Sequence, residues 1–150
     1  MIDAVHNTNL TIRAFNKHKD SDEFLIFKSS VGTNIYADVY ATPVMYLTNK
    51  RIWLMNWSFI QTHRPDTISF YNIDVIEKFT GKTPIGIKYH SIILASNKNP
   101  NEHIMIKLKE NVRDAFYNAL VALKTKYTED KSYMNQDEVR KKIIPMFANI

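Results

Sequence analysis

The fold of this 150-residue chain is decided by one segment, Tyr46-Leu47-Thr48-Asn49-Lys50-Arg51-Ile52-Trp53-Leu54. Thr48-Asn49-Lys50 is polar and separates two apolar runs, which predicts two strands joined by a tight turn. In the second strand, expected over residues 51–61, Ile52 and Leu54 point to one face, whereas Trp53 and Met55 point to the other. Both faces are apolar, so we expect this strand to be covered on both sides or to cross a barrel bend.

Similar short β segments surround this hairpin. They are expected at residues 24–28, 36–47, 67–71, 74–80, 85–89, 91–96 and 103–109. Turns are expected at Gly32-Thr33-Asn34, 81–84 and 97–101. Pro43 restricts the middle of its strand to a sheet edge or a bulge. About seven short strands with frequent turns indicate a small sandwich or a partly open barrel.

After residue 109 the hydrophobic period changes to that of a helix. Asn111 is a favourable N-cap, and an apolar stripe follows. The stripe consists of Val112, Phe116, Leu120, Leu123 and Tyr127. A second, shorter helix is expected from Asn135, where Glu138 would complete a capping box, and Pro145 should end it or kink it.

This order of elements resembles the pleckstrin-homology-like superfamily, in particular its GRAM-type domains. The resemblance is carried by residues 46–54, by residues 68–76 (ISFYNIDVI) and by the opening strand at 22–27. It implies a mainly β (α+β) fold, a barrel of about seven antiparallel strands in two near-orthogonal sheets with the 111–127 helix capping one open end. It covers residues 22–127 and leaves an N-terminal extension (1–21) and a C-terminal helical extension (128–150).

Composition excludes several chemistries. The chain has no cysteine, so disulfides, a thiolate nucleophile and Cys-based metal centres are excluded. It has three glycines, too few to favour glycine-rich phosphate loops. Gly81-Lys82-Thr83 looks like the end of such a loop, but position 76 is isoleucine where the motif needs glycine.

The five histidines show no i, i+4 pair and no neighbouring carboxylate at ligand spacing. There is also no Gly-x-Ser-x-Gly nucleophile elbow. We therefore expect a non-catalytic protein with no catalytic residues, no metal site, no cofactor and no small-molecule substrate.

The formal net charge of +5 favours interaction with anionic partners. The candidate contacts to an anionic ligand or membrane are basic residues at or near expected strand ends, namely Lys28, Lys50, Arg51, Arg64 and Lys82. Lys78 and Lys88 occupy similar positions. The loop at 29–34, where pleckstrin-homology domains usually bind phosphoinositides, contains no basic residue, which disfavours that specific ligand. The alternative is that these lysines serve solubility alone.

The C-terminal segment is unusually apolar for a chain end. The candidate protein-interaction residues in it are Ile143, Ile144, Met146, Phe147 and Ile150. We expect this segment to dock on its own domain, ahead of self-association and ahead of membrane insertion. The strand interrupted by Pro43 could leave an open edge for an added peptide.

These features predict a PH/GRAM-like adaptor that binds a protein partner or itself. Peripheral binding to anionic membrane lipids is the alternative. Binding of single-stranded nucleic acid, with Trp53, Trp57, Tyr71 and Tyr89 as stacking residues, is a second and less favoured alternative. The longest apolar runs are too short to span a bilayer, and residues 1–20 lack the apolar core of a secretory signal, which predicts a cytoplasmic protein.

Overall fold

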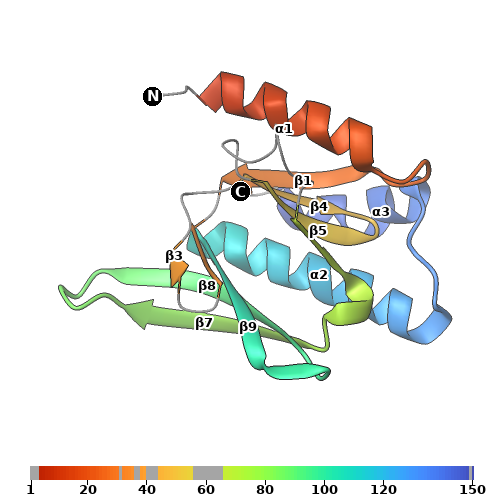
Figure 1. The fold of residues 1–150 in the computed structure, drawn as a ribbon. Coiled ribbons are helices and arrows are strands. Elements are labelled where there is room, and N and C mark those ends of the chain that lie inside the picture. The colour runs from red at the N-terminus through yellow and green to blue at the C-terminus, as the bar shows by residue number, and fades with distance from the viewer. Residues whose placement is uncertain (1–3, 31, 36–37, 40–43, 56–65, 149) are drawn as a thin grey trace.

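Two antiparallel sheets form the body of the molecule (Figure 1). The computed structural model describes residues 4–30, 32–35, 38–39, 44–55, 66–148 and 150. Sheet A has the order β1 (Leu25–Ser30), β4 (Val44–Thr48), β5 (Arg51–Met55) and β6 (Asp66–Ser69). Sheet B has the order β3 (Asp38–Val39), β2 (Gly32–Ile35), β9 (Asn99–Leu108), β8 (Lys88–Ser96) and β7 (Val75–Lys82).

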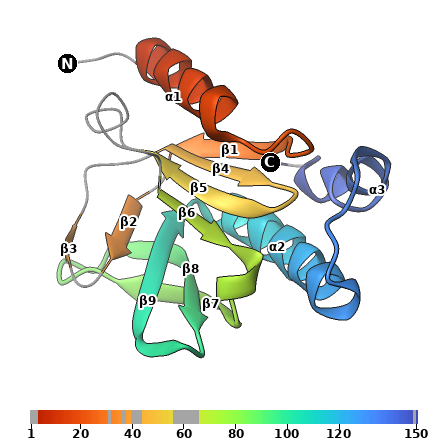
Figure 2. The same cartoon turned by 45° about the vertical axis from the view of Figure 1, so that its right-hand side comes forward.

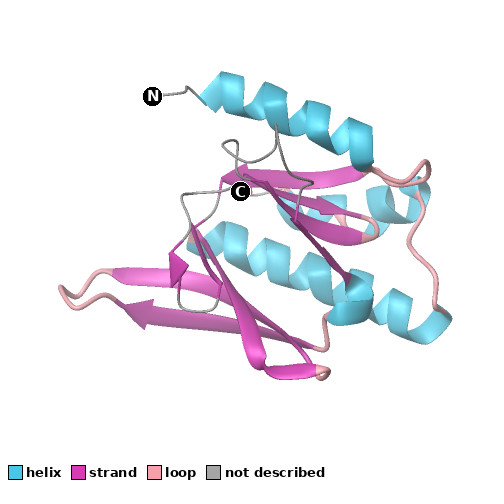
Figure 3. Ribbon diagram, in the orientation of Figure 1, coloured by secondary structure: helices cyan, strands magenta, loops and turns pink. Residues whose placement is uncertain are grey.

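The helical elements cover the sheets and join their ends (Figure 3). They are α1 (Ala4–His18), η1 (Phe70–Asn72), α2 (Glu110–Asp130), α3 (Gln136–Lys142) and η2 (Ile144–Phe147). Figure 2 shows α2 lying between the two sheets, as expected for a helix that covers the open side of a barrel.

The chain passes from one sheet to the other between β1 and β2. β1 pairs with β4 in sheet A, and β2 pairs with β9 in sheet B. The expected turn at Gly32-Thr33-Asn34 is therefore wrong, because these residues form ladder pairs with β9. Local turn propensity is overruled here by pairing with a distant strand.

Three further boundaries differ from the sequence-based expectation. A single strand, β8, spans Lys88–Ser96 and joins the end of the segment expected at 85–89 to the one expected at 91–96, whereas residues 85–87 lie in the preceding turn and not in a strand. β7 continues through Lys82, and β9 begins at Asn99 inside the expected 97–101 turn. Pro43 and the expected strand residues 36–37, 40–43 and 56–61 lie outside the described residues.

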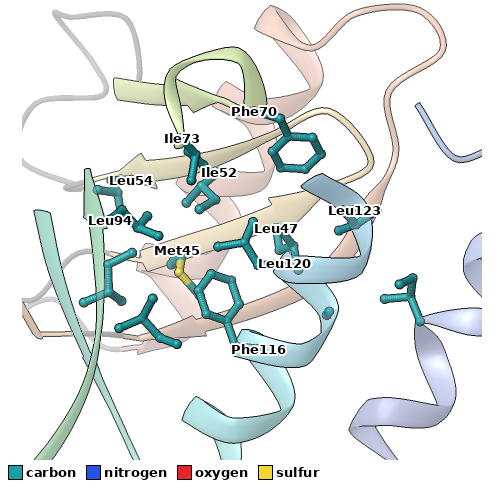
Figure 4. Close-up of a cluster of buried hydrophobic side chains, with 14 of the residues drawn as sticks. Met45, Leu47, Ile52, Leu54, Phe70, Ile73, Leu94, Phe116, Leu120 and Leu123 are labelled. Carbon is teal, nitrogen blue, oxygen red and sulfur yellow. The ribbon is translucent and has the colours of Figure 1, made fainter. Parts of the chain in front are cut away.

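The β4–β5 hairpin forms as predicted, with Leu47 opposite Ile52 and Tyr46 opposite Trp53. One face of this hairpin enters the main core, which is shared by both sheets and α2 (Figure 4). Its fully buried members include Met45, Leu47, Ile52, Ile92, Ile106, Phe116 and Leu120. The helical stripe predicted from Val112 to Tyr127 thus supplies its central residues to the core.

The opposite face of the same hairpin enters a second core beneath α1, which the sequence analysis missed. Phe15 of α1 lies edge-on to Tyr46 and Trp53, with ring centres 5.4 and 5.0 Å apart. Thr11 Oγ1 lies within hydrogen-bond distance of Tyr46 Oη, at 3.0 Å. The two apolar faces of β5 are therefore each covered, as its sequence predicted.

The helix boundaries correct one predicted cap and confirm another. Lys109, not Asn111, is the N-cap of α2, because β9 leads into the helix without an intervening loop. Asn135 does cap α3, and its side chain accepts a 2.9 Å hydrogen bond from the backbone N–H of Glu138. α3 ends at Lys142, and Pro145 lies in the following η2 turn.

Candidate functional site

The turn between β4 and β5 carries two of the predicted anion contacts, Lys50 and Arg51. Lys50 Nζ lies 2.6 Å from Asp22 Oδ1 and 3.4 Å from Asp20 Oδ2. Arg51 Nη2 lies 2.8 Å from Glu23 Oε1. The positive charges of this turn are therefore balanced by the acidic segment that follows α1, and an anionic ligand would have to displace those carboxylates.

Glu23 is the centre of this arrangement, with a side chain that is 0% exposed. Besides Arg51, its carboxylate accepts hydrogen bonds from Thr48 Oγ1 at 2.7 Å and from Trp53 Nε1 at 2.8 Å. Burial alone would raise the pKa of the Glu23 carboxyl, but the hydrogen bonds from Arg51, Thr48 and Trp53 outweigh burial and lower that pKa. A buried carboxylate with this many donors is a structural anchor and has no free position for a ligand.

The β7–β8 hairpin has the opposite character. Ile85 and Ile87, at its tip, are 80% and 59% exposed. The tip is held by hydrogen bonds, with Thr83 N–H donating to Ile87 C=O at 2.8 Å and Gly86 N–H donating to Thr83 C=O at 2.9 Å. Gly86 has a φ of +85°, a conformation that favours glycine. An ordered turn therefore presents two large aliphatic side chains to solvent.

Basic residues flank this apolar tip. Lys82 and Lys88 are both exposed and lie opposite each other in the β7–β8 register. Within the described part of the chain, neither lysine forms an ion pair, in contrast to Lys50 and Arg51. Figure 1 shows the hairpin projecting from the body of the molecule.

A shallow recess of about 520 Å³ opens beside the base of the hairpin. It is lined by Lys88, Tyr89, His90, Lys107, Leu108, Lys109 and Glu110. Lys107 Nζ lies 4.9 Å from the centre of the Tyr89 ring, and His90 Nε2 lies 3.8 Å from Glu110 Oε2. Three of the seven lining residues are lysines, so positive charge continues from the hairpin onto the adjoining sheet.

The predicted basic contacts thus do not form one rim. Lys28 is exposed on β1, and Lys50 and Arg51 belong to the β4–β5 hairpin, all in sheet A. Lys82 lies in sheet B beside Lys88. Arg64 lies outside the described residues, as does His63. The anion-binding role of all five basic residues stays a prediction.

The apolar C-terminal segment docks on its own domain, as expected. Ile143 is fully buried in the main core, and Met146 and Phe147 pack against it. Phe147 stacks on Phe27 with ring centres 4.6 Å apart. Ile144 and Ile150 remain 44% and 45% exposed. Three of the five predicted interaction residues are thus engaged inside the molecule.

The residues singled out for stacking on nucleic-acid bases are distributed differently. Trp53 is 1% exposed beneath α1. Tyr89 lies over Gly81 in the hairpin, and Tyr71 is 54% exposed in η1. Trp57 lies outside the described residues. The described rings therefore do not form one platform.

Within the described residues, no group of three or more His, Asp or Glu side chains is placed to hold a metal ion. Among the described helices, none combines the length and the apolar character needed to cross a bilayer.

Comparison with known proteins gives the class of fold. No family model and no curated protein matches the chain. Among solved structures, the chain is similar to the Vps36 N-terminal PH domain, with a TM-score of 0.58 and 16% identity over 73% of this chain and 86% of that one. It is also similar to the C-terminal domain of an unknown protein from Leishmania infantum, with a TM-score of 0.56 and 13% identity over 79% and 97%.

These similarities show the fold alone, which is PH-like, as the sequence predicted. The assignment to GRAM-type domains stays a prediction. So does the division into residues 1–21, 22–127 and 128–150, although α1 and α3 both pack on the body of the domain.

Sequence reasoning overlooked the hairpin tip as a functional feature. Residues 84–87 read Pro-Ile-Gly-Ile between Lys82 and Lys88, an apolar pair inside a turn with a lysine on each side. The expected turn at 81–84 and strand at 85–89 place Ile85 and Ile87 in a strand, whereas the structure has them at the tip of the turn.

Proposed function

We propose that this chain is a non-catalytic PH-like module that attaches to an anionic membrane surface through the β7–β8 hairpin. The observation that carries the proposal is the exposed Ile85 and Ile87 at an ordered tip, flanked by Lys82 and Lys88, which form no ion pair with any residue that the structure describes. Aliphatic side chains enter the acyl boundary of a bilayer, while lysines next to them remain at the level of the anionic headgroups.

The expected energies suit reversible attachment. Full burial of an isoleucine side chain contributes ~1.5–3 kcal/mol. A lysine close to an anionic leaflet contributes about 1 kcal/mol. Two isoleucines and two lysines therefore combine two independent attractions, which is the usual requirement for a peripheral protein.

This proposal places membrane binding ahead of protein binding, the reverse of the order that the sequence favoured. The C-terminal residues that suggested a protein partner are largely packed on their own domain. Lys50 and Arg51 are engaged by carboxylates, so the hairpin in sheet B becomes the strongest candidate for anion contact. A module of this kind would act in the cytoplasm, at the membrane periphery.

Sedimentation with vesicles tests the proposal. We expect the chain to sediment with phosphatidylcholine vesicles that contain phosphatidylserine, and much less with phosphatidylcholine alone. The double variant Ile85→Ser, Ile87→Ser should lower the partition coefficient at least about tenfold. Ile144→Ser is the matched control, because it removes an exposed isoleucine from another surface.

Absence of sedimentation with the acidic vesicles would overturn the proposal and restore protein binding as the leading function. Equal sedimentation with both vesicle types would contradict the role of the lysines. A loss in the control variant as large as in the double variant would contradict the role of the hairpin.

A further inference from the structure

A second basic surface lies at the far end of α2. It consists of Tyr71 in η1, Lys98 in the β8–β9 turn, and Lys124, Tyr127 and Lys131 at the end of α2, and we call it the lysine–tyrosine surface. The hairpin recess reaches Glu110, the first residue of α2, and the 21-residue helix separates the two places by about 30 Å. The two surfaces are therefore distinct.

Each lysine of this surface lies over a tyrosine ring. Lys98 Nζ is 3.2 Å from the centre of the Tyr71 ring. Lys124 Nζ and Lys131 Nζ are each 5.5 Å from the centre of the Tyr127 ring. The rings hold the cations without neutralising their charge.

Local structure positions these side chains. Lys124 Nζ donates a 2.6 Å hydrogen bond to the carbonyl of Phe70, next to Tyr71. Asp74 accepts a 2.7 Å hydrogen bond from the backbone N–H of Asn97, which fixes the turn that carries Lys98. Lys131 caps α2 in a left-handed conformation, with its N–H donating to Tyr127 C=O at 2.8 Å.

Asp74 supplies only a partial counter-charge to these lysines. Within the described ranges, none of Lys98, Lys124 and Lys131 forms an ion pair, and the carboxylate of Asp74 is committed to the β8–β9 turn. Burial lowers the pKa of Lys124. Asp74 has the largest charge effect and raises that pKa, and the positive charges of Lys131 and Lys98 make smaller contributions that lower it. Lys131 and Lys98 are thus each close enough to Lys124 to repel its charge.

We propose that the lysine–tyrosine surface binds an acidic peptide segment of a protein partner. The lysines lie over two separate rings, Tyr71 and Tyr127, so several carboxylates spaced along an extended segment could each meet one lysine. These carboxylates would also relieve the repulsion among the lysines. A single phosphate fits less well, because it needs donors that converge on one point.

Single-stranded nucleic acid also fits less well. Base stacking needs free aromatic faces, whereas Lys98 lies over Tyr71, and Tyr127 is stacked on Tyr133 with ring centres 5.4 Å apart. Both rings thus make contacts within the molecule, and this surface offers a partner mainly its positive charge.

Fluorescence anisotropy with a labelled peptide of ten glutamates tests the proposal. We expect the double variant Lys98→Gln, Lys131→Gln to weaken peptide binding about tenfold, because each exposed ion pair contributes a few-fold. Lys82→Gln, Lys88→Gln removes the same charge from the hairpin and should leave peptide affinity within about twofold. The single variant Lys131→Gly removes one cation, and glycine favours the left-handed conformation of this position. The variant should therefore fold at least as stably as the wild type, so weaker peptide binding would come from the lost charge.

Failure of the wild-type chain to bind the peptide would overturn the proposal. An equal loss from both double variants would show attraction to net charge alone and would also overturn it. Tighter binding of a ten-nucleotide thymidine strand than of the peptide would replace the acidic segment by nucleic acid. None of these outcomes depends on vesicle binding, so the membrane proposal is tested independently.

Discussion

The two hairpins β4–β5 and β7–β8 each carry basic residues at a turn, and they differ in what surrounds those residues. At β4–β5, Lys50 and Arg51 meet Asp20, Asp22 and the buried Glu23. At β7–β8, Lys82 and Lys88 meet solvent on both sides of an apolar tip. The difference shows that the positive charge of a basic turn is available to a partner only when no carboxylate of the same chain reaches it.

The largest effect is expected at the anchor of the β4–β5 hairpin. Glu23→Gln should lower the free energy of unfolding by about 3 kcal/mol, because it leaves the half-buried Arg51 guanidinium without its carboxylate. Urea denaturation measures this loss. Asp22→Asn, at a carboxylate that is 72% exposed, is the control and should change the free energy of unfolding far less. A loss below about 1 kcal/mol for Glu23→Gln would mean that the anchor contributes little.

The same carboxylate predicts a dependence of stability on pH. The folded-state pKa of Glu23 lies below its ordinary value of 4.5, so its contribution is complete above that value and is lost as the pH falls through the folded pKa. Unfolding measured from pH 7 to pH 3 should therefore show a smaller acid-induced decline in Glu23→Gln than in the wild type. Parallel declines in the two proteins would contradict the assignment.

The next effect concerns the β7–β8 hairpin. Lys82→Gln, Lys88→Gln should lower partition into phosphatidylserine-containing vesicles about 30-fold, since each lysine contributes about 1 kcal/mol near an anionic surface. The free energy of unfolding should change little, because both side chains are exposed. An unchanged partition coefficient would mean that the isoleucines bind the membrane without help from the lysines.

A smaller effect is expected from the backbone of the hairpin tip. Gly86→Ala should destabilise the turn by about 1 kcal/mol, because the φ of +85° disfavours a residue with a Cβ. No atom lies within 4 Å of the added methyl group, so the cost is conformational and not steric. Thermal unfolding and vesicle partition should both decrease slightly, and an increase in stability would exclude this conformation of the tip.

The smallest effect is expected from Lys50→Gln. The pairs of Lys50 with Asp20 and Asp22 should contribute little to stability, because both carboxylates are largely exposed. Vesicle partition should stay within about twofold of the wild type. A loss as large as that of the β7–β8 lysines would place Lys50 at the membrane and remove the contrast between the hairpins.

Much of the fold was predictable because its signals are local. Alternation in residues 51–55 predicted two covered faces, and both are covered. The apolar stripe predicted α2, and Asn135 predicted the start of α3. The turn at Gly32-Thr33-Asn34 was wrongly predicted, because pairing with β9 depends on residues about 70 positions away.

The candidate sites were less predictable. The sequence places a lysine beside each turn, but it does not show that residues 20–23 return to neutralise one turn and leave the other free. It likewise does not show that Lys98 and Lys131 lie near the same end of α2. Such juxtapositions depend on how the sheets and helices pack.

By itself, the amino-acid sequence determined a β-rich fold with a covering helix and an apolar C-terminal segment, while its PH-like class came from the resemblance to that superfamily. These features follow from hydrophobic periodicity and capping, which act over a few residues. Only the tertiary structure decided that α1 covers the outer face of sheet A and that Glu23 is buried beside Arg51. It also decided that, among the described residues, lysines without an ion pair gather at the β7–β8 hairpin and at the end of α2. The physical reason is that the effect of a charge depends on the carboxylates and water around it, and that environment is set by packing between distant segments.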